Sequence, residues 1–363
     1  MKKLAGTKEV YIIMKNKALV FALAGMMAVT SLTGCSSSFD GDAVAITVGE
    51  EEVTAAVANF YARYTQAQYE TYYGAYLGEN MWSSEASEGK NYEEFVKESV
   101  QDSLEVMVLS EQHADEYKAA LTDEEKEMIV KSAKEFEDAN DQKNKDLVSG
   151  DQETVERVMT LLAVNNKVME AIKADADTDV SDEEAAQKSM MYVRYEYESY
   201  NEDGETETVT DEEKAELQKK AKELSDAAKN GGDFEKLAKD QEMTPNTVSF
   251  DSESTNYDAE LIAAADQLKK DEVSDVIETE TACYVVKLVS EFDKEATETK
   301  KSEIVSERQN DLYTEVTDGW KEEVEIKVDE KVWDAIDFNQ LSVSVVTEET
   351  DSSEEQAVTE EAE

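Results

Sequence analysis

Apolar residues recur at helical spacing through most of this chain. In the segment near 91–118, Val96, Val100, Leu104, Met107 and Val108 fall on one stripe, which is typical of an amphipathic helix with one buried face. The same pattern predicts a helix that begins near Thr54. It also predicts helices over about 152–174, 211–229, 233–240, 258–268, 297–322 and 332–338.

Alternating apolar and polar residues predict fewer strands. Residues 44–53 read VAITVGEEEV and indicate a strand followed by a turn, and residues 190–199 read MMYVRYEYES. Tyr284–Val289 and the alternating segment 324–328 complete the set. The chain therefore runs from a helical block to a block of strand, helices and strand, and then to one more long helix, which predicts an α+β protein of two domains.

Three segments carry the capping-box pattern in which a hydroxyl residue precedes a cluster of acids. They begin at Thr122, Ser181 and Thr210, and each continues Asp-Glu-Glu. The hydroxyl accepts a hydrogen bond from the first turn, the third acid reaches back, and the acids lie at the positive end of the helix dipole. We expect each of them to begin a helix.

The N-terminal segment has the composition of an export signal. Lys15 and Lys17 precede the apolar run 18–29, which is too short to span a bilayer comfortably. The residues that follow end in Leu-Thr-Gly-Cys, which resembles a bacterial lipobox with Cys35 as the lipidated residue. The alternatives are a plain signal peptide or a membrane anchor with a chance cysteine. Either Met1 or Met14 can be the true start, since residues 1–13 add nothing to the signal.

Composition excludes several classes of function. The 363 residues carry a formal net charge of −51, so no basic surface is available for nucleic acid. Cys283 is left without a partner once Cys35 is lipidated, and we expect it to be a buried structural thiol. The chain has a single histidine and no C-x-x-C motif or Cys/His cluster, so we expect no metal site and no cofactor.

Several phrases, taken in order, resemble the PrsA/SurA family of extracytoplasmic foldases. VAITVGEEEVTAAVANF resembles the family's opening, and GGDFEKLAKD and DEVSDVIETETACYVVKLV resemble phrases of its parvulin prolyl isomerase domain. The resemblance implies a mainly helical SurA-N-like chaperone domain, completed by a C-terminal helix, with a small parvulin-like α/β domain inserted. We predict a signal peptide at 1–34, a tether at 35–42, the chaperone domain at 43–188, the parvulin-like domain at 189–292, the returning helix at 293–340 and an acidic disordered tail at 341–363.

Family parvulins carry one pocket histidine on the first strand and one on the last. By resemblance these positions fall at Tyr195 and Tyr284, and the substrate-pocket apolar residues fall at Tyr257 and Leu261. The family's Gly-Gly-Asp-Leu-Gly loop is absent. Isomerisation needs a dry pocket and a polar network that favours the twisted amide, so these departures predict weak or lost catalysis.

Aromatic residues crowd the segment from Phe60 to Tyr76. A stripe at helical spacing is core by default, but seven aromatics in this segment exceed what one helix face buries. We therefore expect Tyr61, Tyr64, Tyr72 and Tyr76 to offer apolar contact, with an adaptable polar tip, to unfolded chains.

These expectations describe a chaperone anchored by Cys35 to the extracytoplasmic face of a bacterial membrane, with unfolded or nascent exported polypeptides as partners. One alternative is an active prolyl isomerase. Another is a structural or solute-binding surface lipoprotein, although a solute-binding protein should show more βα units. The sequence leaves open whether the N- and C-terminal helices pair within one chain or are exchanged in a homodimer.

Overall fold

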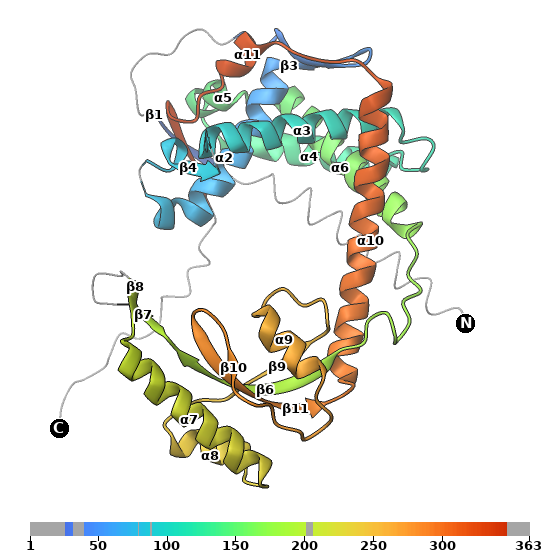
Figure 1. Cartoon of the computed structure of the whole chain (residues 1–363). Helices are drawn as coiled ribbons and strands as arrows, with labels where there is room; N and C mark the ends of the chain where they lie inside the picture. The colour runs from blue at the N-terminus through green and yellow to red at the C-terminus, as the bar shows by residue number, and fades with distance from the viewer. Residues whose placement is uncertain (1–25, 32–39, 79, 88, 201–205, 347–363) are drawn as a thin grey trace, which may run out of the picture. The chain divides into compact units, whose positions relative to one another are not determined.

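The computed structural model describes residues 26–31, 40–78, 80–87, 89–200 and 206–346. The chain forms two compact units, one from Met1–Asp175 with Asp311–Glu363 and the other from Ala176–Asn310. The helix α10 (Lys294–Glu323) begins in the second unit and ends in the first. The protein is thus mostly helical with a small sheet-containing unit inserted (Figure 1), as the order of elements predicts.

Helices dominate the first unit. The stripe that begins at Val96 and Val100 is buried, and it packs with apolar residues of the neighbouring helices into one core. Burial of this kind stabilises a helix more than its intrinsic propensity does. The elements are α2 (Ala55–Leu77), η1 (Met81–Ser83), α3 (Tyr92–Gln112), α4 (Asp123–Ala139), α5 (Gln142–Val148), α6 (Gln152–Ala174) and α11 (Glu330–Asp334).

A three-stranded antiparallel sheet joins the two ends of this unit. Its central strand β2 (Val44–Val48) pairs with β3 (Glu51–Thr54) on one side and with β12 (Ile326–Val328) on the other. A short hairpin of β4 (Glu85–Ser87) and β5 (Lys90–Asn91) precedes α3. The segment after α10 therefore returns to the helical unit through backbone pairing as well as through side-chain packing.

A second small sheet corrects the prediction of a disordered tail from residue 341 onward. Residues 341–346 form the strand β13 (Leu341–Val346), which pairs antiparallel with β1 (Met26–Ser31). Leu341 and Val343 are buried in the helical core, so their apolar side chains hold the segment in place. The acidic residues 347–363 lie outside the described residues, as do Cys35 and the rest of 32–39.

Two of the three capping boxes begin helices. The side chains of Thr122 and Thr210 each accept a hydrogen bond from the backbone N–H of the glutamate three residues on, and that glutamate side chain accepts from the threonine N–H. These two residues begin α4 and α7 (Asp211–Lys229). The prediction for Ser181 is wrong. Its Oγ accepts from the Glu184 N–H at 3.1 Å, but the chain makes only turns there.

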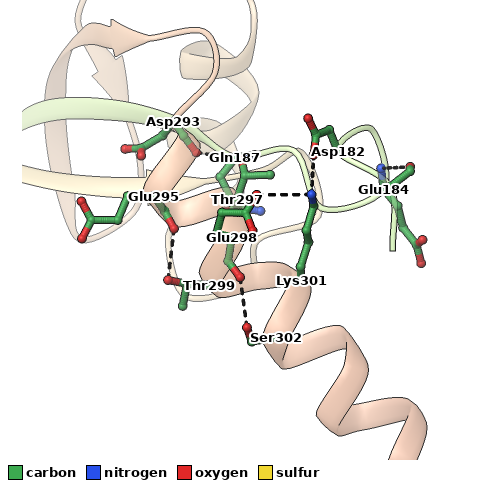
Figure 2. Close-up of polar contacts among 11 residues, drawn as sticks. Asp182, Glu184, Gln187, Asp293, Glu295, Thr297, Glu298, Thr299, Lys301 and Ser302 are labelled. Carbon is green, nitrogen blue, oxygen red and sulfur yellow. Dashed lines mark hydrogen bonds and ion pairs between the residues drawn. The ribbon is translucent and has the colours of Figure 1, made fainter. Parts of the chain in front are cut away.

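The reason for that failure lies in the strand that follows. Gln187 is already engaged with the start of α10: its N–H donates to Thr297 Oγ1 at 3.1 Å, and its carbonyl accepts from the Asp293 N–H at 2.7 Å (Figure 2). An extended segment is therefore required within a few residues of Ser181, which leaves no room for a helix.

The second unit is built on a four-stranded antiparallel sheet in the order β10–β11–β6–β9. The helices α7 and α8 cover one face of this sheet, and α9 covers the other (Figure 1). A separate hairpin of β7 and β8 follows β6. The elements are β6 (Lys188–Glu196), β7 (Glu198–Tyr200), β8 (Thr206–Thr208), α8 (Phe234–Asp240), β9 (Asn246–Phe250), α9 (Ala259–Asp266), β10 (Ile277–Glu278) and β11 (Ala282–Ser290).

Candidate functional site

The register between β6 and β11 decides which side chains share a face of the sheet. Tyr284 lies directly opposite Arg194, and Cys283 lies directly opposite Tyr195. Directly opposed residues project from the same face, and the face alternates with each residue along a strand. Tyr284 therefore shares a face with Arg194 and Tyr192, whereas Tyr195 projects from the other face.

Three tyrosines gather on the α9 face, and we call Tyr192, Tyr257 and Tyr284 the aromatic cluster. The Tyr192 ring centroid lies 5.9 Å from that of Tyr284 and 6.3 Å from that of Tyr257, both in edge-on geometry. This separation and tilt suit aromatic rings. Leu261 of α9 is buried in the same apolar group, so three of the residues predicted for the pocket lie together.

A polar rim accompanies the aromatic cluster. The guanidinium carbon of Arg194 lies 6.0 Å from the centroid of the Tyr284 ring, within the range of a cation–π contact. Burial, followed by a hydrogen bond with Asp258, raises the pKa of Tyr284. Its hydroxyl is a neutral hydrogen-bond donor at neutral pH, and its one proton is directed to Asp258.

Asp258 carries the one buried side-chain oxygen for which the described residues supply no hydrogen-bond partner, Oδ2. An unsatisfied buried acceptor costs about 1–3 kcal/mol. Asp258 precedes α9 directly and does not cap it with its side chain.

The prediction that Tyr195 shares a pocket with Tyr284 is wrong. Tyr195 is fully buried on the α7 and α8 face, where its hydroxyl donates to Gln241 Oε1 at 2.8 Å. Burial raises the pKa of Tyr195 well above its usual range, so it is a neutral core residue. A shift of one residue along a strand moves a side chain to the opposite face.

Cys283 lies beside Tyr195 in that same core. It is fully buried and unpaired, and burial raises the pKa of its thiol. A protonated, buried thiol is a poor nucleophile, which agrees with the expectation of a structural role.

The tyrosines of α2 divide into two groups. Tyr61 and Tyr64 are half-buried against the helical core, and burial raises the pKa of both. By contrast, Tyr72 is 71% exposed and Tyr76 is 89% exposed at the C-terminal end of the helix. Tyr73, which the sequence reasoning did not single out, is also exposed and lies 5.5 Å from the Tyr69 ring.

The polar members of the site were also missed. Tyr192 and Arg194 lie on one face of β6 and Tyr195 on the other, and the alternation of side chains along a strand is visible in the sequence. Only the pairing with β11 shows which of these faces meets α9. Asp258 offered no signal of its own. Within the described part of the chain, no group of three or more metal-binding side chains is present, and none of the described helices is long and apolar enough to cross a membrane.

A comparison with known protein families matches residues 194–300 to the PPIC-type PPIase domain. This match begins within β6 and includes Tyr257 and Tyr284 of the aromatic cluster. The inserted unit is thus a domain of the parvulin prolyl isomerase class.

Part of the chain is similar in sequence to foldase proteins. The chain is 40% identical over 105 residues to the foldase protein PrsA of Streptococcus mutans, a match that covers 25% of this chain and 32% of that protein. It is 30% identical over 125 residues to the foldase protein PrsA of Streptococcus agalactiae, covering 31% and 39%. The match spans about a third of the length of these relatives. The chain is therefore similar to PrsA foldases over part of its length, and it contains a PPIC-type PPIase domain.

Solved structures of foldases are also similar to parts of the chain. The PrsA structure from Streptococcus pneumoniae has a TM-score of 0.32 at 24% identity, covering 71% of this chain and 99% of that one. The PrsA structure from Lactococcus lactis has a TM-score of 0.32 at 17% identity, covering 81% and 97%.

Proposed function

We propose that this protein is a membrane-anchored, extracytoplasmic chaperone that holds exported polypeptides while they fold, with a parvulin-type domain whose isomerase activity is weak or lost. The observation that carries the proposal is the site on the α9 face. It keeps an aromatic surface and a neutral donor at Tyr284, in a chain whose single histidine, His113, belongs to the other unit.

The chemistry of this site favours binding over turnover. Rotation about a peptide bond has a barrier of about 18–20 kcal/mol, and lowering it requires groups placed for the twisted amide rather than for the planar one. Tyr192 and Tyr257 supply a surface for a proline ring, and Tyr284 supplies one donor. We infer that an extended chain binds here and that its isomerisation is accelerated weakly at most.

The helical unit supplies the second element of the proposal. Tyr72 and Tyr76 expose large rings at the end of α2, and exposed aromatic groups of this kind are typical of surfaces that bind other chains. A tyrosine gives apolar contact and an adaptable hydroxyl without a demand for one partner sequence. This suits a chaperone that binds many clients.

Anchoring is the third element. Removal of residues 1–34 and lipidation of Cys35 would tether the chain outside the cytoplasm, next to polypeptides that have just crossed the membrane. The processed chain, without the five Lys and one Glu of residues 1–34, has a formal net charge of −55, which supports solubility and keeps the protein off anionic surfaces.

Two assays on the processed chain without its lipid test the proposal. One follows the proline-limited phase of a refolding protein, and the other follows suppression of aggregation of an unfolded client. We expect suppression with little or no acceleration. Strong acceleration would identify an active isomerase with Tyr284 in its site, and failure in both assays would favour a structural or solute-binding lipoprotein.

The Arg194, Tyr284 and Asp258 arrangement favours the active isomerase as the second candidate. A guanidinium and a neutral hydroxyl on one face can donate to the amide nitrogen, whose lone pair becomes available when the peptide bond twists out of conjugation. If refolding is accelerated, Tyr284→Phe should abolish that acceleration, whereas Tyr195→Phe, on the opposite face, should leave it unchanged.

A further inference from the structure

The strand β13 is held along its two edges by different parts of the chain. Along one edge, side chains of α2 bind its backbone: the Val343 N–H donates to Glu70 Oε2 at 2.9 Å, and the Leu341 carbonyl accepts from Gln66 Nε2 at 2.6 Å. Along the other edge, its backbone pairs with β1 over six residue pairs. The two-stranded sheet is complete only while β1 is present.

The support from α2 is independent of β1. The Glu70 carboxylate also accepts from Trp82 Nε1 at 2.9 Å and from Ser342 Oγ at 2.6 Å, and the Gln66 side chain is fully buried. Val343 itself lies in the core of the helical unit. These contacts fix β13 in place whether or not its partner strand remains.

The partner strand belongs to the segment that processing would remove. Residues 26–31 precede the lipobox cysteine, Cys35. Cleavage before Cys35 would therefore take β1 away and leave β13 fixed, with an unpaired edge. Unpaired backbone groups on a sheet edge are a template for a further strand, and addition of an extended peptide to such an edge is a common mode of recognition.

We propose that in the processed protein this β13 edge binds an extended, uncharged segment of an exported polypeptide by antiparallel strand addition, and that β1 occupies the same edge in the precursor. The proposal rests on the processing assumed in the proposed function. The chain's own β1 shows what the edge accepts: six consecutive residues, MMAVTS, without a charge. A second copy of the protein is a poorer occupant, because removal of residues 1–34, with five Lys and one Glu, leaves each processed chain with a formal net charge of −55, and two such chains repel each other.

The register specifies which backbone groups an occupant must offer. Since Leu341 and Val343 direct their backbone groups toward α2, the residues between them direct theirs toward the opposite edge. Ser344 faces Ala28 across the sheet and Ser342 faces Thr30. Ala28 and Thr30 of the occupant should therefore bond to β13, whereas the N–H of Val29 should point away.

Backbone methylation of a peptide tests this directly. A labelled synthetic peptide of residues 24–33 is titrated into the chain that begins at Ser36, and binding is followed by fluorescence anisotropy. We expect saturable binding, a loss of about tenfold or more when the Ala28 nitrogen is methylated, and little change when the Val29 nitrogen is methylated. The two methylated peptides have the same composition, so they differ only in which backbone nitrogen is blocked. The test also needs no variant of the protein that could fail to fold.

A second arm uses the unprocessed chain with Cys35→Ser, which retains β1 and should not bind the peptide. Equal effects of the two methylated peptides, or equal binding by the processed and unprocessed chains, would overturn the proposal. Concentration-dependent dimerisation of the processed chain that the peptide does not reverse would assign the edge to a second copy and also overturn it. Aggregation suppression is measured on the same samples, so a failure of strand addition is separable from a failure of the chaperone function.

Discussion

Tyr284 of β11 lies directly opposite Arg194 of β6, and the Arg194 guanidinium carbon lies 6.0 Å from the centroid of the Tyr284 ring. This pairing defines the candidate site of the parvulin domain, because it sets which residues of β6 face α9. It also separates the site from Tyr195, which lies one residue further along β6 and on the other face.

We predict that a proline-containing peptide perturbs the backbone resonances of Tyr192, Arg194 and Tyr257 in the ¹⁵N-labelled processed chain. Resonances of Tyr195 and Gln241, which are hydrogen-bonded to each other on the opposite face, should move little. The measurement is a chemical-shift titration, with a peptide in which alanine replaces the proline as control. Perturbations centred on Tyr195 would contradict the assignment of the site.

Replacement of the exposed tyrosines should weaken client holding without unfolding the protein. We expect Tyr72→Ser with Tyr76→Ser to raise several-fold the concentration needed to suppress aggregation. Tyr72 is 71% exposed and Tyr76 is 89% exposed, and we propose that their rings contact clients. The unfolding free energy should change by less than about 0.5 kcal/mol. Urea unfolding and light scattering on the same preparation measure both quantities.

The matched control is Tyr61→Ser in the same helix. Tyr61 packs against the core, so this change should lower the unfolding free energy by about 2–3 kcal/mol, while holding by the folded fraction persists. Unchanged holding in the double variant would show that the exposed rings do not contact clients.

The capping residues offer a prediction about stability. Thr122→Ala should lower the unfolding free energy of the helical unit by about 1 kcal/mol, because Thr122 forms a complete capping box at the start of α4. Ser181→Ala removes a similar exposed bond at 3.1 Å that begins no helix, and it should have a smaller effect. Urea denaturation of the two variants compares them, and equal losses would contradict the structural difference.

The buried tyrosines predict a loss of stability at alkaline pH. Burial raises the pKa of Tyr195 and Tyr284 above the usual value of 10.0, so both stay neutral in the folded state while their unfolded counterparts ionise. Stability is therefore fully present below about pH 10 and falls as pH rises above it, by at least about 1 kcal/mol per pH unit. Urea unfolding at a series of pH values measures this slope.

Tyr195→Phe is the control for that slope. Removing one ionisable hydroxyl should make the loss of stability above pH 10 shallower by about 1 kcal/mol per pH unit. A slope that does not change would show that Tyr195 ionises in the folded state, in conflict with its burial.

Local patterns predicted most of the helices because each pattern carries its own physical cause. The apolar stripe of α3 repeats at a spacing of three or four residues, and the capping boxes at Thr122 and Thr210 are satisfied within the first turn of their own helices. A single sequence displays both patterns. The local pattern at Ser181 did not produce a helix. Thr297, which is distant in sequence, accepts a hydrogen bond from the Gln187 N–H, and the strand β6 begins at the next residue. The failure is a tertiary contact that overrides a correct local signal.

The candidate site was less accessible to sequence reasoning. Tyr257, Leu261 and Tyr284 were predicted from family phrases and lie together on the α9 face. Tyr192, Arg194 and Asp258 were missed, because the first two depend on strand register and the third on an unsatisfied oxygen that only packing reveals. The resemblance located the two strands, but it did not show that Tyr195 and Tyr284 project from opposite faces of the sheet.

By itself, the sequence determined the helical and strand periodicities, the order of the two kinds of block and the acidic charge, because these depend on neighbours along the chain. Only the tertiary structure decided which face of β6 meets α9, and that Leu341–Val346 packs as a strand against α2 instead of joining the acidic tail. Both depend on pairing between segments far apart in sequence. A side-chain alternation of two residues leaves the choice of face undetermined until a partner strand fixes the register.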